Sequence, residues 1–259
     1  MQPAMKEFEV KITRQQSEVE EAQRLRFEVF NLEMKKGLES SYRAGLDVDE
    51  FDQYCDHLIV RDLRTRRIVG TYRLLLGSEV RGRCGFYAEE EFDLENVKKL
   101  GGELLELGRS CAHKDYRDKA LVNFMWQAIA DYVRAHQVRY LFGCASLYTV
   151  EPRAVSEYYS FLKSRYYAPV EFRVQPKLRH AFSELAEEAR TRNDQTLFLR
   201  LPSLIKGYLR IGALLCGPPA LDPEFGTTDL FLLLDITKMD SEYLQRFGFS
   251  DSQDHRAAH

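Results

Sequence analysis

The chain has 259 residues, a formal net charge of −3 and 44% hydrophobic residues, a composition typical of an ordinary globular protein. The slight acidic excess argues against nucleic acid as the main partner, because nucleic-acid-binding chains are usually basic. The five cysteines are odd in number and scattered, which predicts neither a disulfide framework nor a zinc site. No stretch approaches the ~20 apolar residues of a membrane span, and no secretion signal is recognisable at the N-terminus. We therefore expect a cytoplasmic protein that holds no metal.

Hydrophobic periodicity predicts alternating strands and helices along most of the chain. Strands are expected at 8–12, 55–62, 68–76, 103–113, 138–147, 196–201 and 229–236. Helices are expected at 17–30, 119–135, 154–164, 178–192 and 203–215. The first of these helices has Ser17 as its expected N-cap, with Glu20 completing a capping box. This order predicts one α/β domain, residues 1–249, with a twisted mixed central sheet and flanking helices. Residues 250–259 are expected to form a polar disordered tail.

The strand at 103–113 is apolar enough for the centre of a sheet, yet it contains Glu106 and Arg109. Strict alternation would point these two side chains to opposite faces. A bulge at or near Gly108 would add one residue, reverse the alternation and let both side chains reach one pocket. The bulge would also release backbone N–H groups that can hold an oxyanion.

A basic loop follows this strand and leads into the helix at 119–135. A strand, a basic loop and a helix N-terminus in succession suit a ligand that carries phosphate. The basic residues of this segment that we consider are Lys114, Arg117 and Lys119. The alternative is that they form an ordinary solvated surface.

Four short motifs occur in the order found in acyl-homoserine-lactone synthases: residues 25–30, 49–52, 70–73 and 106–109. A longer C-terminal run, residues 201–230, more closely resembles the hemolysin-like ornithine N-acyltransferases. Both groups belong to the GCN5-related N-acyltransferase (GNAT) superfamily. The resemblance implies the GNAT-like fold and transfer of a (3-hydroxy) fatty acyl group from acyl carrier protein to the α-amine of an amino acid, ornithine above all. The product would be of the lyso-ornithine-lipid type.

Two departures from these relatives bear on the substrates. The tryptophan that autoinducer synthases place shortly after the Phe30 position is replaced by the segment 34–37, which argues against the homoserine-lactone reaction. The loop 116–120 lacks the glycines that relatives using coenzyme A place at the pyrophosphate. Acyl carrier protein presents a single phosphate, so this loop favours the carrier protein as donor.

The resemblance also assigns the candidate site residues. The catalytic candidates are Glu106, as general base, and Arg109. The candidates for binding the acceptor are Arg26, Phe30, Asp49, Asp52 and Arg73. The candidates for binding the carrier protein or its phosphopantetheine are Lys114, Arg117 and Lys119. No bound cofactor is expected, since the acyl donor is a substrate.

Several alternatives remain open at this point. Glu106 and Arg109 could form a buried ion pair that only shapes the strand, and the other charged candidates could form a structural network. The chain could also be an autoinducer-type or other N-acyl amino acid synthase, or a non-catalytic module that binds acyl carrier protein or lipid. Peripheral contact with the inner face of the membrane is a further open possibility.

Overall fold

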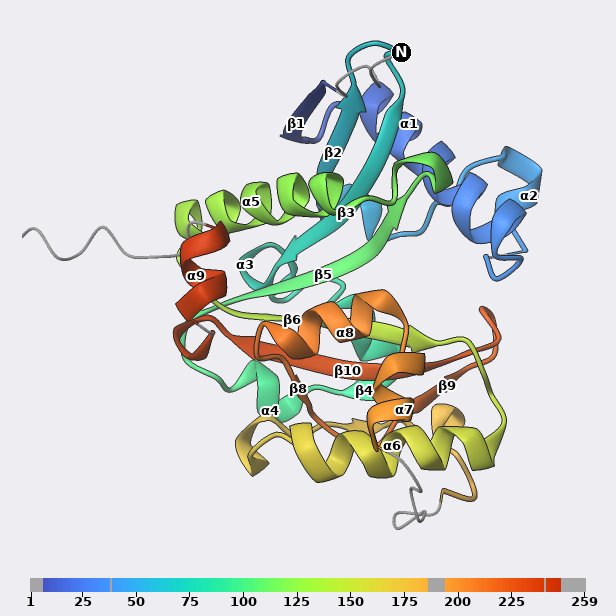
Figure 1. Cartoon of the computed structure of the whole chain (residues 1–259), viewed down its shortest axis with the longest axis vertical. Helices are drawn as coiled ribbons and strands as arrows, with labels where there is room; N and C mark the ends of the chain where they lie inside the picture. Colours follow the sequence, from blue (N-terminus) through green and yellow to red (C-terminus); the bar gives the residue numbers. More distant parts are fainter. Residues whose placement is uncertain (1–6, 38, 186–193, 240, 248–259) are drawn as a thin grey trace, which may run out of the picture.

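The computed structural model describes residues 7–37, 39–185, 194–239 and 241–247. It has a central eight-stranded sheet in the order β1-β2-β3-β5-β6-β10-β8, with β9 also paired to β10 (Figure 1). Every neighbouring pair is antiparallel except β5 and β6, which are parallel. The strands are β1 (Phe8–Thr13), β2 (Asp56–Asp62), β3 (Ile68–Leu76), β5 (Glu103–Ala112), β6 (Val138–Leu147), β8 (Leu214–Leu215), β9 (Ala220–Asp222) and β10 (Thr227–Asp235). The expected α/β fold with a mixed central sheet is confirmed.

Helices flank this sheet, together with a small second sheet of β4 (Phe92–Asp93) and β7 (Gln175–Pro176). The α-helices are α1 (Gln16–Phe27), α2 (Ser41–Ala44), α3 (Gly77–Val80), α4 (Glu95–Lys98), α5 (Lys119–Ala135), α6 (Pro152–Tyr166), α7 (Asp194–Arg200), α8 (Ser203–Arg210) and α9 (Ser241–Phe247). The 3₁₀ turns are η2 (Asp52–Tyr54), η3 (Tyr87–Glu90), η4 (Lys114–Tyr116), η5 (Val170–Phe172), η6 (Leu178–His180) and η7 (Ile236–Lys238), and η1 (Glu28–Glu33) is a π-helical turn that continues α1. No described helix has both the length and the apolar character needed to cross a membrane.

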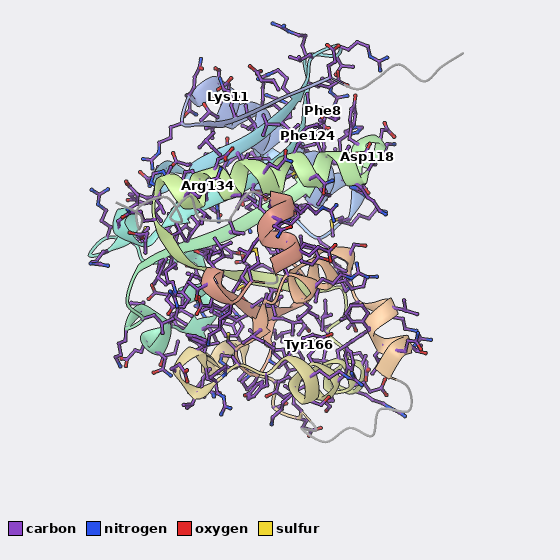
Figure 2. All side chains as sticks on the ribbon, turned by 60° about the vertical axis from the view of Figure 1, so that its left-hand side comes forward. Phe8, Lys11, Asp118, Phe124, Arg134 and Tyr166 are labelled. Carbon is purple, nitrogen blue, oxygen red and sulfur yellow. The ribbon has the colours of Figure 1, made fainter. Side chains whose placement is uncertain are left out.

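The two faces of the sheet bury different helices because strand residues alternate in direction. Leu58 of β2 belongs to the core that contains α5, whereas its neighbour Ile59 packs with α1. α5 presents Leu121, Met125 and Ile129, spaced four apart, to its face of the sheet. Its N-terminus is capped by Asp118, whose side chain accepts a hydrogen bond from the Leu121 amide (3.0 Å), and Figure 2 shows Asp118 at that end of the helix.

β5 contains the expected bulge. Thr71 of β3 pairs with Cys111, while Arg73 pairs with Gly108, so Arg109 and Ser110 together face a single residue of β3. Arg109 has a φ of 48°, in the left-handed region that residues other than glycine rarely adopt. The extra residue is therefore Arg109 itself, and Gly108 lies directly before it.

The parallel pairing of β5 with β6 ends where the bulge begins. Its last pair is Glu106 with Phe142, and no described residue beyond them continues the ladder. At the point of divergence, a Cβ on Gly143 would lie 2.3 Å from the Leu107 carbonyl oxygen, so this close approach requires glycine. The two central strands then separate and open a cleft between them.

The start of the first helix differs from the sequence-based expectation. α1 begins at Gln16 and its N-cap, Gln15, makes no side-chain capping bond, so Ser17 is not the cap. Thr13 takes the polar role at this turn, since its hydroxyl accepts from the Gln15 amide (3.0 Å) and donates to Glu18 (2.6 Å). The helix therefore starts one residue earlier than expected.

Three elements of the C-terminal half also differ. The expected strand at 196–201 is wrong, because residues 196–200 belong to α7. Leu197 of this helix and Leu201 just after it are buried, while Leu199 is 64% exposed. The helix expected at 203–215 ends at Arg210, and 214–215 pair with β10. The helix expected at 178–192 is wrong over 178–185, where only η6 forms, and its remainder lies outside the described residues. The same holds for the tail expected at 250–259, which stays a prediction.

Candidate active site

A cleft of about 1150 Å³ opens where β5 and β6 separate. Its walls differ in chemistry. The apolar wall comes from α5, α8 and their surroundings and includes Trp126, Leu201, Ile205, Tyr208 and Ile211. The polar wall lies on the opposite face of the sheet and includes Tyr87, Glu106, Arg109, Asp222 and Asp229. A second, apolar cavity of about 30 Å³ shares Leu107, Trp126 and Tyr208 with the cleft, so the apolar wall continues inward.

Glu106 lies at the point of strand separation and is only 4% exposed. Its two carboxylate oxygens accept hydrogen bonds from the backbone amides of Tyr87 and Ala88, both at 2.8 Å. Burial raises the pKa of Glu106 to about 7, although these two amides favour the ionised form. A carboxylate has about four acceptor positions, so two bonds leave capacity for a ligand proton.

Arg109 enters the same cleft from the bulge, but it does not pair with Glu106. Its Nη2 donates to Asp49 at 3.1 Å, and its Nε lies 3.3 Å from Asp47. The guanidinium also lies between the rings of Tyr87 and Phe225, 4.8 and 5.0 Å from their centroids. The structure thus brings Glu106 and Arg109 into one cleft, and the alternative of an ion pair between them is wrong.

The aspartates that hold Arg109 belong to a larger group of alternating charges. We call it the arginine–aspartate network, and its members are Arg26, Asp47, Asp49, Asp52, Arg73 and Arg109. Arg26 Nη2 lies 2.6 Å from Asp47 and its Nη1 lies 2.8 Å from Asp52. Arg73 Nη1 donates to both oxygens of Asp49 at 2.6 Å. With three guanidinium groups and three carboxylates, the network is electrically neutral.

Burial makes this neutrality important. Arg26 is 1% exposed and Asp47 is fully buried. Burial opposes the ionisation of Asp49, yet Arg73 and Arg109 hold the pKa of that carboxyl below its ordinary value. Each charge therefore depends on its partners, and the removal of one would leave another buried without compensation.

The acceptor-binding candidates divide into two groups in the structure. Phe30 and Arg73 line the cleft. Arg26, Asp49 and Asp52 are not among the lining residues and lie behind it, in the arginine–aspartate network. Asp47, a central member of the network, was missed by the sequence analysis, although it lies two residues before Asp49 in the same loop.

Acidic residues that the sequence analysis missed lie in the polar wall (Asp222 and Asp229) and beside it (Glu91). We call Glu91, Asp222 and Asp229 the carboxylate cluster; they are 4%, 7% and 5% exposed. Carboxylate oxygens of Glu91 and Asp229 and the Sγ of Cys144 all lie within 4.8 Å of one another. Asp229 could have been found by the same reasoning as Glu106, because it is a charged residue within the otherwise apolar run of a buried strand.

The basic loop lies at one mouth of the cleft. Arg117 and Lys119 line it, whereas Lys114 is exposed and is not among the lining residues. Arg117 makes a two-fold ion pair with Glu33 of η1, with N–O distances of 2.6 and 2.7 Å. Since Asp118 already accepts from the Leu121 amide, a capping carboxylate occupies part of the helix N-terminus that a phosphate would use.

Comparison with known proteins identifies the class of fold in which the two parallel central strands separate around Glu106. The profile of the acetyltransferase (GNAT) domain matches residues 25–127. The acyl-homoserine-lactone synthase LasI has the same fold, with a TM-score of 0.50 and 14% identity over 89% of this chain and 91% of that one. FeeM, an N-acyl amino acid synthase from uncultured soil microbes, also has a TM-score of 0.50, with 11% identity over 90% of this chain and 93% of that one. The protein thus has a GNAT-like fold.

Sequence relatives narrow this class. The L-ornithine N(α)-acyltransferase of Brucella abortus is 36% identical over 253 residues, which cover 93% of this chain and 89% of that protein. The L-ornithine N(α)-acyltransferase of Rhodobacter capsulatus is 34% identical over 242 residues, covering 91% of this chain and 93% of that protein. The chain belongs to the L-ornithine N(α)-acyltransferase family, which confirms the resemblance found in its sequence.

Proposed function

We propose that the protein transfers a fatty acyl group, with a 3-hydroxyacyl group preferred, from acyl carrier protein to the α-amine of ornithine. The observation that carries this proposal is the position of Glu106. It is a buried carboxylate with a pKa raised to about 7, at the junction between an apolar wall and a polar wall of one cleft. A thioester with its acyl chain suits the first wall, and an amino acid suits the second.

Glu106 serves as the general base in this reaction. The α-amine of an amino acid is mostly protonated at neutral pH, and only its free lone pair can attack the thioester carbonyl. The carboxylate takes one proton from the ammonium, and the free amine forms a C–N bond with the thioester carbon. The C–S bond then breaks, and the departing thiolate takes up the second proton that the nitrogen releases as it becomes an amide. Backbone N–H groups of the bulged part of β5 would stabilise the tetrahedral oxyanion. No covalent enzyme intermediate is required.

The acceptor lies against the polar wall, where Phe30, Arg73 and Arg109 line the cleft. An arginine can bind an α-carboxylate through parallel hydrogen bonds. Arg26, Asp49 and Asp52 support this wall indirectly, because their ion pairs fix the positions of Arg73 and Arg109. They are positioning residues in this proposal.

The donor enters at the mouth formed by the basic loop. Lys114 and Lys119 would attract acidic groups of a carrier protein to this mouth, while Arg117, the third basic residue, is paired with Glu33. The Asp118 cap leaves fewer amide donors for a pyrophosphate, which supports acyl carrier protein over coenzyme A. We expect kcat/KM for acyl-ACP to exceed that for acyl-CoA and to fall with salt. Lys119→Glu should lower kcat/KM for acyl-ACP, whereas Lys99→Glu, at the exposed C-cap residue of α4, serves as the matched control. Equal use of both donors, without salt dependence, would rule out the carrier-protein preference.

The decisive experiment for the reaction is Glu106→Gln, which should lower kcat by about 10²–10⁴-fold. The amide NH₂ of glutamine would also face a backbone N–H, so the variant loses one hydrogen bond as well as its basicity. Glu103→Gln is the matched control, since Glu103 lies on the same strand and accepts from the Ser78 amide at 3.0 Å, away from the cleft. A folded Glu106→Gln enzyme with the wild-type kcat from pH 6 to 9 would show that Glu106 is not the base.

A cytoplasmic enzyme that releases a lipid-like product would benefit from contact with the inner face of the membrane. Leu204 lines the cleft and is 37% exposed, and the nearby Leu199 of α7 is 64% exposed. Peripheral binding through this mouth should appear as co-sedimentation with phospholipid vesicles that is weakened by Leu199→Ser. Unchanged vesicle binding by the Leu199→Ser variant, or no vesicle binding by the wild type, would rule out this part of the proposal.

A further inference from the structure

The carboxylate cluster is not balanced by positive charge. In the arginine–aspartate network each guanidinium is paired with aspartates of that network. This holds also for Arg109, whose positive charge lowers the pKa of Glu91 but which pairs with Asp47 and Asp49. Glu91, Asp222 and Asp229 make no ion pair among the described residues. Three buried carboxylates without a cation are costly, and such groups normally coordinate a cation or take up protons.

Glu91 supplies an independent sign that a ligand is missing. Its Oε2 is fully buried and has no hydrogen-bond partner among the described residues, although buried polar atoms nearly always have one. The other two carboxylates have local partners. Asp222 caps a turn by accepting from the Glu224 and Phe225 amides (2.9 and 3.1 Å), and Asp229 accepts from the Thr227 hydroxyl at 3.3 Å. The unsatisfied acceptor is therefore Glu91, and it lies beside Asp229.

The cluster can be reached from the cleft. Asp222, Asp229 and Cys144 all line it, and they lie on the same wall as Glu106. In the ladder between β6 and β10, Cys144 pairs with Phe231 and Ser146 pairs with Asp229, so Cys144 and Asp229 lie on the same face of the sheet. A cation bound here would be inside the same cavity as the general base, so it would belong to the molecule that is being acylated.

We propose that the carboxylate cluster is the binding subsite for the side-chain ammonium of the acceptor, and that it selects diamino acids over amino acids with uncharged side chains. The inference rests on the proposed function, since it places the acceptor at the polar wall. An alkylammonium has three N–H donors in a compact head, which matches a group of carboxylates that includes an unsatisfied oxygen. A neutral side chain of the same length would leave Glu91 unsatisfied.

The titration of the cluster agrees with this assignment. Burial, followed by the neighbouring Asp229 and Asp222, raises the pKa of Glu91, and burial with Asp222 raises the pKa of Asp229. Burial also raises the pKa of the Cys144 thiol, so Cys144 adds no negative charge to the cluster. Binding of an ammonium should lower the carboxyl pKa values and release protons to solvent.

The test compares two acceptors, ornithine and norvaline, which has the same carbon chain without the side-chain amine. For the wild type we expect a strong preference for ornithine in kcat/KM. Glu91→Gln and Asp229→Asn should lower kcat/KM for ornithine by about 10²-fold or more, while norvaline changes by less than about threefold. Glu90→Gln is the matched control, because Glu90 is the exposed neighbour of Glu91 and should keep the wild-type preference.

Two further measurements separate binding from folding. In calorimetry with two buffers of different ionisation enthalpy, ornithine should release protons from the wild type, and norvaline should not. Asp229→Asn should raise the melting temperature of the unliganded protein at pH 8 by about 2–4 °C or more, because Asp229, with a pKa raised to about 6, is charged there and its replacement relieves charge crowding. A carboxylate that only supports the fold would give a lower melting temperature instead.

The outcomes distinguish this inference from the proposed function. If the wild type acylates ornithine but the variants lose ornithine and norvaline equally, or keep the wild-type preference, the subsite is not the carboxylate cluster. Stoichiometric binding of Zn²⁺ that is abolished by Asp229→Asn, together with inactivation by a chelator, would also overturn it. If the wild type acylates no α-amine, the proposed function fails, and proton release on ornithine binding still decides the subsite.

Discussion

The two groups of buried charge at the cleft have opposite designs. In the arginine–aspartate network every carboxylate is within 3.3 Å of a guanidinium nitrogen, and the charges sum to zero. In the carboxylate cluster the charges have one sign, and Glu91 retains an unsatisfied oxygen. Buried charges that compensate one another stabilise the fold and fix the positions of Arg73 and Arg109, whereas buried charges without compensation indicate a ligand that supplies it.

The largest expected effect comes from breaking the neutral group. Arg26→Met would leave Asp47 and Asp52 buried with fewer partners, and should lower the free energy of unfolding by about 3–5 kcal/mol. Urea denaturation measures this change. Arg24→Met provides the control, since Arg24 is exposed on the same helix and its replacement should stay within about 0.5 kcal/mol. A similar loss in both variants would mean that the network has no special role.

The two groups should also differ in how they link stability to pH. A carboxyl group whose pKa is raised on folding contributes its full stability at a pH below its ordinary, unfolded-state pKa. That contribution is lost as the pH rises through the folded-state pKa. Glu106, with a pKa raised to about 7 from 4.5, behaves in this way, as do Glu91 and Asp229. Glu106 alone should therefore lower the free energy of unfolding of the unliganded protein by about 2–3 kcal/mol between pH 5 and 8, and Glu91 and Asp229 should add to this loss.

The pH dependence of stability tests the difference between the carboxylate cluster and the arginine–aspartate network more sharply. Glu91→Gln should flatten it, because one raised pKa is removed. The pKa values of Asp49 and Asp52 are lowered, so the network contributes a loss of stability only when pH falls through the acid range below pH 4. Denaturation curves at several pH values test both statements, and a stability that rises from pH 5 to 8 would contradict the first.

Catalysis should show the ionisation of Glu106 directly. Because the base must be deprotonated, kcat/KM should rise about tenfold per pH unit below pH 6 and level off above about pH 7. The measurement is the initial rate with acyl donor in excess, corrected for ionisation of the amine. A rate independent of pH from 5 to 7 would exclude a base with this pKa.

The smallest effect is expected at the exposed mouth. Glu33→Gln removes the partner of Arg117, but the pair is exposed, so the free energy of unfolding should change by less than about 1 kcal/mol. The released guanidinium adds positive charge at the donor entrance. A modest decrease in KM for acyl-ACP, of about twofold, should accompany it, and an increase would show that the pair itself forms the docking surface.

Much of the fold could be predicted from local patterns. The bulge in β5 could be predicted because Glu106 and Arg109, on either side of Gly108, would point to opposite faces of a regular strand. The helix α5 could be predicted from the spacing of its apolar residues. The prediction of a strand at 196–201 failed because leucines at 197, 199 and 201 fit the alternation of a strand. Burial of the first and third of them, four residues apart, also fits a helix. Only tertiary packing distinguishes the two, and it leaves Leu199 outside.

The site was predictable to a smaller extent. Glu106 and Arg109 stand out because they are charged residues in an apolar strand. The carboxylate cluster combines Glu91, from the turn after η3, with Asp222 and Asp229, more than a hundred residues later. No spacing in the sequence reveals such a meeting, which depends on how β9 and β10 lie against η3. The neutrality of the network is likewise visible only in three dimensions.

The passage of the cleft between β5 and β6 has a consequence for the order in which substrates bind. Its apolar wall and its polar wall belong to opposite faces of the sheet. The neighbouring residues Leu107 and Glu106 of β5 point to the apolar wall and to the polar wall, respectively. Donor and acceptor therefore need not share an entrance, and neither has to leave before the other arrives. Initial-rate kinetics should show intersecting double-reciprocal lines, the pattern of a ternary complex, in place of the parallel lines of a ping-pong reaction.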